Sequence, residues 1–160
     1  MMKTILQTAA IVAATLLASA AGAQSPTVDH LTQADLLAKA QQIAPQATET
    51  GLATVKLADY PNHFTMITLR NKSGIAEVHE QYADVFLVLR GKATLVTGGT
   101  VPEAKTVSPG EIRGAAVQGG TQTSLTKGDV VHIPAKVPHQ LLLPAHSEFV
   151  YFVIKVKELE

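Results

Sequence analysis

Alternating apolar and polar positions dominate the chain from residue 51 onward and predict a series of short β-strands. The predicted strands are 53–57, 63–70, 75–79, 85–89, 92–97, 121–125, 130–133, 140–143 and 148–156, of which 85–89 is a continuous apolar run. Turn residues separate them at intervals of about 8–12 residues, which is typical of an antiparallel sandwich or barrel. The Arg90-Gly91-Lys92 turn predicts that residues 85–97 form a hairpin. The pattern therefore predicts a mainly all-β domain.

One helix is predicted ahead of the strands. Thr32 precedes Asp35 at the spacing of an N-terminal capping box. Apolar residues then follow at helical spacing, at Leu36, Leu37, Ala40 and Ile43. We expect a helix over residues 32–44 that ends at Pro45 and packs on the outside of the strands.

The first residues have the pattern of a signal peptide. Lys3 supplies a positive charge, an apolar stretch follows from Ile5 to Ala18, and Ala21-Gly22-Ala23 is a small-x-small cleavage signal. We predict a signal peptide over 1–23, with cleavage after Ala20 or an uncleaved anchor as alternatives. The apolar stretch is short for a membrane span, so a periplasmic or secreted location without stable membrane insertion is expected. Residues 24–50 would then form an arm and helix, and residues 51–160 the β-domain.

Composition limits the possible chemistry. The chain has 160 residues, 46% of them apolar, no net charge and no tryptophan. Without a basic stripe, nucleic acid is not expected as a partner. Because cysteine is absent, any metal must be held by carboxylates and by some of the six histidines.

A long segment rich in glycine and proline, residues 98–120, separates two predicted strands. Long ordered loops are often functional, so two interpretations remain open: a functional loop, or a surface insertion with short strand fragments. Glu111 and Arg113 are the charged residues of this segment that we consider most relevant to a function.

The segment from Gly128 to Leu143 reads G-D-V-V-H-I-P-A-K-V-P-H-Q-L-L-L. It resembles the second motif of the cupin superfamily, G-x5-P-x-G-x2-H-x3-N. Gly128, Pro134 and His139 match, whereas Lys136 replaces a glycine and Leu143 replaces the final asparagine.

The segment from Glu77 to Gly91 reads E-V-H-E-Q-Y-A-D-V-F-L-V-L-R-G. It resembles the first cupin motif, G-x5-H-x-H-x(3,4)-E-x6-G, with His79 as the second histidine and Asp84 at the glutamate position. Glu77 stands where the first histidine is expected, and Asn71 where the opening glycine is expected. Residues two apart on a strand share a face, so Glu77 and His79 can point into the same space.

The resemblance covers about residues 53–156 and implies a double-stranded β-helix, or jelly-roll barrel, that often forms a homodimer. It is specific for the fold and not for one activity. It also implies a divalent transition metal held by His79 and His139, with Asp84 at the carboxylate position. Two histidines and a carboxylate are the composition of a facial triad, and Glu77 or Asp84 could supply that carboxylate.

We favour Glu77, His79 and His139 as ligands, with Asp84 as a fourth ligand or as an orienting group. A carboxylate left unligated, Glu77 or Asp84, could act as a general base. The residues do not distinguish iron, manganese, zinc, nickel and copper. Gln81, His63 and Arg113 are candidate contacts to a small-molecule substrate. The orientations of His63 and His132 stay open.

Three functions are compatible with these residues. The first is a metal-dependent cupin enzyme of oxygenase, isomerase or lyase type, in which the metal binds substrate oxygen or O₂. The second is a module that binds a small ligand without turnover. The third is a metal-free structural barrel.

Overall fold

The computed structural model describes residues 28–158, so the predicted signal peptide lies outside the described residues. The chain divides into two units, residues 1–30 and 31–160, and the second contains all the elements discussed below. Within the described range, no helix is long and apolar enough to cross a membrane.

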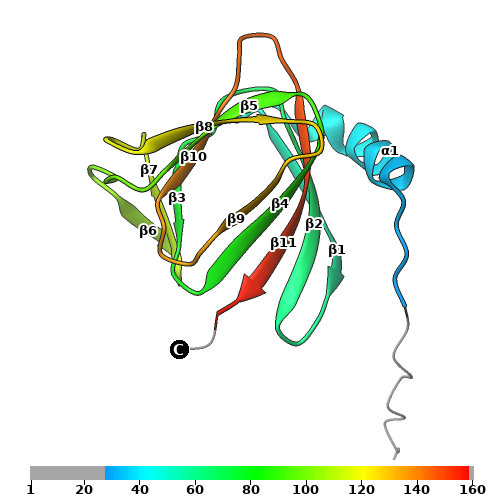
Figure 1. Ribbon diagram of the computed structural model, residues 1–160, viewed down its shortest axis with the longest axis horizontal. Coiled ribbons are helices and arrows are strands. Elements are labelled where there is room, and N and C mark those ends of the chain that lie inside the picture. The colour runs from blue at the N-terminus through cyan, green and yellow to red at the C-terminus, as the bar shows by residue number, and fades with distance from the viewer. Residues whose placement is uncertain (1–27, 159–160) are drawn as a thin grey trace, which may run out of the picture. The chain divides into compact units, whose positions relative to one another are not determined.

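The second unit is built mainly of β-strands, as predicted. Its strands are β1 (Leu52–Asp59), β2 (His63–Arg70), β3 (Ala76–His79), β4 (Tyr82–Arg90), β5 (Lys92–Thr97), β6 (Lys105–Ser108), β7 (Glu111–Gly114), β8 (Thr121–Thr126), β9 (Val130–Ile133), β10 (His139–Leu142) and β11 (Phe149–Lys157). They form two antiparallel sheets, ordered β1-β2-β11-β4-β9 and β6-β7-β3-β10-β5-β8. The sheets face each other around a common interior (Figure 1).

Several predicted strand limits agree with the structure. The bounds of β2, β5 and β9 coincide with the predicted stretches 63–70, 92–97 and 130–133. In contrast, β4 begins three residues before the predicted stretch 85–89, so Asp84 lies within a strand. The segment 98–120 forms the two short strands β6 and β7, and β7 pairs with β3.

The predicted hairpin over residues 85–97 is wrong. β4 pairs with β11 and β9 in one sheet, whereas β5 pairs with β10 and β8 in the other. Gly91 stands between them with φ +88, and a Cβ there would lie 2.0 Å from the backbone oxygen of Glu148. The Arg90-Gly91-Lys92 turn therefore carries the chain from one sheet to the other.

The N-terminal helix α1 (Gln33–Ile43) confirms the predicted capping box, because Thr32 and Asp35 bond to each other's backbone. Pro45 lies in a short 3₁₀ helix, Ala44–Gln46, that ends the helical segment. The buried face of α1 packs on the outer surface of the five-stranded sheet, with these partners: Ala53, Ile67, Leu69, Leu89 and Val150. Consequently, β2 carries apolar residues on both of its faces: Ile67 and Leu69 toward α1, and Phe64 and Met66 toward the interior.

A second apolar cluster lies between the sheets. It includes Phe86 and Val88 of β4 and Phe149, Tyr151 and Val153 of β11. Continuing along the same faces by two residues leads to Asp84 on β4 and Lys155 on β11, which are direct cross-strand partners. The interior thus changes from apolar to charged along these two strands, and the charged part lines a pocket.

Candidate metal centre

The pocket between the sheets has a volume of about 210 Å³. Its charged, polar and aromatic lining residues are Thr54, Phe64, Thr68, Arg70, Glu77, His79, Asp84, Phe86, Glu111, Arg113, His139, Gln140, Tyr151 and Lys155. Many of these residues are two positions apart on one strand and so face the same side of the sheet, for example Glu77 and His79 on β3. His139 of β10 is the register partner of Glu77, so both predicted motifs meet in one place.

Two buried histidines direct the same ring atom into this pocket. The Nδ1 atom of His139 lies 3.0 Å from the backbone oxygen of Val137, which can only accept a hydrogen bond. The Nδ1 atom of His79 lies 2.8 and 3.0 Å from the carboxylate oxygens of Glu111. These bonds place the proton on Nδ1 in both neutral rings, which leaves both Nε2 atoms as free lone-pair donors.

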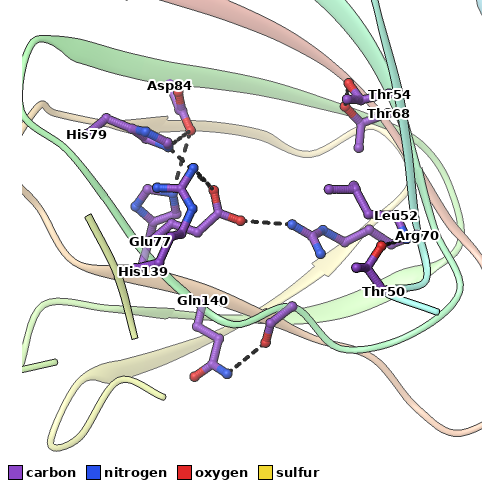
Figure 2. Close-up of polar contacts among 12 residues, drawn as sticks. Thr50, Leu52, Thr54, Thr68, Arg70, Glu77, His79, Asp84, His139 and Gln140 are labelled. Carbon is purple, nitrogen blue, oxygen red and sulfur yellow. Dashed lines mark hydrogen bonds and ion pairs between the residues drawn. The ribbon is translucent and has the colours of Figure 1, made fainter. Parts of the chain in front are cut away.

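Two carboxylates complete the group. In each, one oxygen pairs with a cationic side chain and the other faces an imidazole Nε2 atom. Asp84 gives Oδ1 to the Lys155 ammonium, while its Oδ2 lies 3.4 Å from His79 Nε2 and 3.5 Å from His139 Nε2. Glu77 gives Oε1 to Arg70 at 2.9 Å, while its Oε2 lies 3.6 Å from His79 Nε2. Figure 2 shows Glu77 between the histidines and Arg70.

Three of these four residues form a group that can hold a divalent cation. Ligand atoms of Glu77, His79 and His139 lie within 4.8 Å of one another, and the buried Nε2 of His79 has no hydrogen-bond partner. Ligands about 2.1 Å from one cation would lie roughly 3.0–3.4 Å apart. The distances from the carboxylate oxygens to the Nε2 atoms, 3.4–3.6 Å, are close to this spacing. Lone pairs that face one another without a proton or cation between them are electrostatically unfavourable, so this donor set favours a metal.

Asp84 is held in its ionised form. Burial acts to raise the pKa of its carboxyl. Without a metal, hydrogen bonds from the His139 and His79 rings when these are protonated at Nε2, together with the positive charge of Lys155, outweigh this effect. The pKa of Asp84 therefore lies well below its usual range. A carboxylate with a low pKa is a suitable metal neighbour and a poor proton acceptor at neutral pH.

A buried arginine and tyrosine support the other carboxylate. Arg70 Nε donates to the Tyr151 hydroxyl at 3.1 Å, and its Nη2 donates to Glu77. Burial acts to lower the pKa of Arg70, but the neighbouring Tyr151 and Glu77 raise it overall. Burial raises the pKa of Tyr151, so its phenol stays protonated near neutral pH. Arg70 is thus a fixed positive charge beside the histidines.

Of the seven predicted site and contact residues, the structure brings five to the pocket and leaves Gln81 and His63 away from it. Glu77, His79, Asp84, His139 and Arg113 line the pocket. Arg113 donates to Glu111 at 2.7 Å and lies 3.5 Å from Glu77 Oε2.

The structure does not bring Gln81, His63 or His132 to this pocket. Gln81 is exposed in the turn between β3 and β4. Phe64 faces the interior, so His63, its neighbour on the strand, points to the opposite side of the sheet. There the His63 ring stacks on the Tyr60 ring, with ring centres 4.3 Å apart. His132 is exposed on β9.

Sequence reasoning gave no role in the site to Arg70, Tyr151 or Lys155, nor to Glu111, which it noted only as a charge. A signal existed for Lys155, which is a charged residue within the largely apolar strand β11. For Glu111, the signal was its position two residues before Arg113 in strand β7, because residues two apart on a strand face the same side.

Comparisons with known proteins show the fold of this chain but match it to no protein family or curated protein. No protein-family model matches the chain, and no curated protein matches it significantly. Among solved structures, a conserved protein with a double-stranded β-helix domain from Klebsiella pneumoniae is 12% identical, with 69% of this chain and 80% of that one covered at a TM-score of 0.51.

Two further solved structures are similar at a lower TM-score of 0.49. A cupin-2 domain from Rhodospirillum rubrum is 15% identical, with 69% of this chain and 62% of that one covered. KdgF from a Halomonas species is also 15% identical, with 70% of this chain and 85% of that one covered. The likeness to the Klebsiella protein shows that the chain has the double-stranded β-helix fold, which confirms the fold predicted from the two cupin-like motifs.

Proposed function

We propose that this protein is an exported cupin that holds a divalent transition metal in the pocket and acts on a small organic molecule. The ligands are the Nε2 atoms of His79 and His139 with one oxygen each from Glu77 and Asp84. The observation that carries the proposal is the convergence of two buried imidazoles, each fixed through Nδ1, on two carboxylate oxygens.

When bound, the metal supplies a Lewis acid for a substrate oxygen. Glu111 and the Val137 carbonyl orient the two imidazoles, and Lys155 holds Asp84. The general base must be a carboxylate that the metal does not hold, so Glu77 takes this role only where Asp84 is the carboxylate ligand. The Glu77 side chain is 21% exposed and can reach a bound molecule, whereas Asp84 is 3% exposed and its pKa is lowered. Apolar walls beside these groups limit the entry of water.

Metal content tests the proposal directly. Protein supplied separately with manganese, iron, nickel, copper or zinc and then dialysed is expected to retain about one equivalent of at least one metal. His79→Ala and His139→Ala should each retain less than about a tenth of that amount, because each removes a nitrogen ligand. Elemental analysis measures the metal. His146→Ala is the matched control, since His146 is exposed, and it should bind as the wild type does. Wild-type protein with less than a tenth of an equivalent of every metal would contradict the proposal.

Glu77→Gln separates a ligand from a neighbour. The amide keeps the size of the side chain and an oxygen for Arg70, but it removes the negative charge that faces His79 Nε2. Metal retention, measured as the dissociation constant against a competing chelator, should weaken by at least about tenfold. Glu148→Gln is the control, because Glu148 also pairs with an arginine, Arg90, but lies outside the pocket. Unchanged retention in Glu77→Gln would remove Glu77 from the ligand set.

A non-catalytic or metal-free cupin is the second candidate. The observation that favours it is Glu77 itself, which stands where the motif expects a histidine and already pairs with Arg70. In such a protein the charged groups would bind a small ligand without a metal. The metal analysis above distinguishes the metal-free form from the metal-binding cupin.

A further inference from the structure

The charges that line the pocket balance one another. Among the described residues, the lining cations are Arg70, Arg113 and Lys155, and the lining anions are Glu77, Asp84 and Glu111. They pair one to one: Arg70 with Glu77, Arg113 with Glu111, and Lys155 with Asp84. With both imidazoles neutral, as metal ligands are, the pocket carries no net charge before a metal binds.

A divalent metal would therefore leave the pocket with an excess of two positive charges. Each lining carboxylate already faces a cation, so none of the described lining residues remains to offset the metal. Uncompensated charge in a desolvated site is costly, and an anionic ligand offsets it. This step rests on the metal-binding function proposed above.

Arg70 is positioned to receive that ligand. Its side chain is 7% exposed, and two of its five N–H groups are used in the hydrogen bonds to Tyr151 and Glu77. Thr54 and Thr68 line the same pocket, with their hydroxyl oxygens 2.9 Å apart. In Figure 2 both threonines lie on the Arg70 side, away from His79 and Asp84. A guanidinium beside hydroxyl groups is a typical partner of a carboxylate.

The remaining lining limits the rest of the ligand. Phe64, Met66, Phe86 and Val153 offer carbon surface, and the volume of about 210 Å³ admits a small molecule. We propose that the pocket binds a small organic carboxylate, whose carboxylate group lies at Arg70, Thr54 and Thr68 and whose carbon skeleton packs on these apolar walls. The substrate class of the proposed metal site is thus a small organic acid.

Matched pairs of ligands test this assignment. Full-length protein, with and without bound zinc, is titrated calorimetrically with acetate and acetamide, benzoate and benzamide, and succinate and succinamide, and with inorganic phosphate. At least one acid should bind zinc-loaded protein at least about tenfold more tightly than its amide, the value of one charge-assisted hydrogen bond. No preference in any pair would overturn the proposal, and so would phosphate binding as tightly as the best acid.

Variants locate the carboxylate. Arg70→Gln and the less disruptive Thr68→Val should each weaken binding of the preferred acid, and Arg90→Gln, which removes a guanidinium outside the pocket, should not. Equal binding by wild type, Arg70→Gln and Thr68→Val would overturn the location. Zinc content is measured in the same samples. Wild-type protein that does not bind zinc would contradict the metal-binding function. The comparison of acids with amides on metal-free protein tests the Arg70 subsite independently of that outcome.

Discussion

Replacing Lys155 with methionine is expected to lower the free energy of unfolding of the metal-free protein by about 3–5 kcal/mol. Lys155 and Asp84 are cross-strand partners on β11 and β4, and their side chains are only 11% and 3% exposed. Methionine fills a similar volume but removes the ammonium group. The Asp84 carboxylate then stays buried without its cation, which is the costly way to break an ion pair.

The pH dependence of this variant follows from the same pair. The pKa of Asp84 is lowered on folding, so its stabilising contribution is present above its unfolded pKa of about 3.9 and is lost as the pH falls toward the folded value. Without Lys155 the folded pKa rises. The free energy of unfolding of Lys155→Met should therefore decrease less than that of the wild type on acidification below about pH 4.

Urea denaturation of metal-free protein measures both effects. Lys56→Met is the matched control, because Lys56 pairs with Asp59 on the surface, where the side chains are 50% and 63% exposed. It should change the free energy of unfolding by less than about 1 kcal/mol. Adding Asp84→Asn to Lys155→Met should recover part of the loss, since it removes the unpaired charge. Equal losses in Lys155→Met and Lys56→Met would contradict the buried pair.

Gly91→Ala is expected to destabilise the protein by about 2–6 kcal/mol, from backbone strain and overpacking together. Gly91 has φ +88, where residues with a side chain are strained. An added Cβ would lie 2.0 Å from the backbone oxygen of Glu148 and 3.1 Å from the Cα of Phe149. Backbone atoms cannot turn aside as a flexible side chain can, so the end of β4 or the start of β11 must move.

Gly98→Ala separates the two contributions. Gly98 has a similar φ, +75, but an added Cβ meets no atom within 4 Å. Its cost is therefore the backbone strain alone, about 1–2 kcal/mol. Urea midpoints of both variants, measured at equal m-values, give the comparison. If Gly91→Ala cost no more than Gly98→Ala, the contact with Glu148 would have no energetic role.

The strands were predictable where local pattern decides them. The limits of β2, β5 and β9 follow from alternation bounded by turn residues, and the limits of α1 follow from Thr32 and Asp35. The error over residues 85–97 arose because alternation does not specify a strand's partner. Two strands joined by a short glycine turn usually pair, but β11 and β9 occupy both edges of β4, and β5 pairs with β10 and β8 in the other sheet.

The site was predictable to a similar depth. Period two placed Glu77 and His79 together, and the second motif supplied His139. Arg70 and His63 on β2 could not be assigned to the inner or the outer face, because β2 carries apolar residues on both: Ile67 and Leu69 pack with α1, whereas Phe64 and Met66 line the pocket. Lys155 depends on a pairing with Asp84 that spans most of the domain, and no local pattern contains it.

The position of β11 has a consequence for how the molecule assembles. It lies between β2 and β4, and it carries Tyr151 and Lys155, the partners of Arg70 and Asp84. Until residues 149–157 are in place, the five-stranded sheet is two separate pieces with unpaired edges. Such non-local pairing makes folding slow, on the order of milliseconds to seconds. Closing the five-stranded sheet also brings Lys155 to Asp84 and Tyr151 to Arg70, so the charge balance of the pocket is completed in the same step as the sheet.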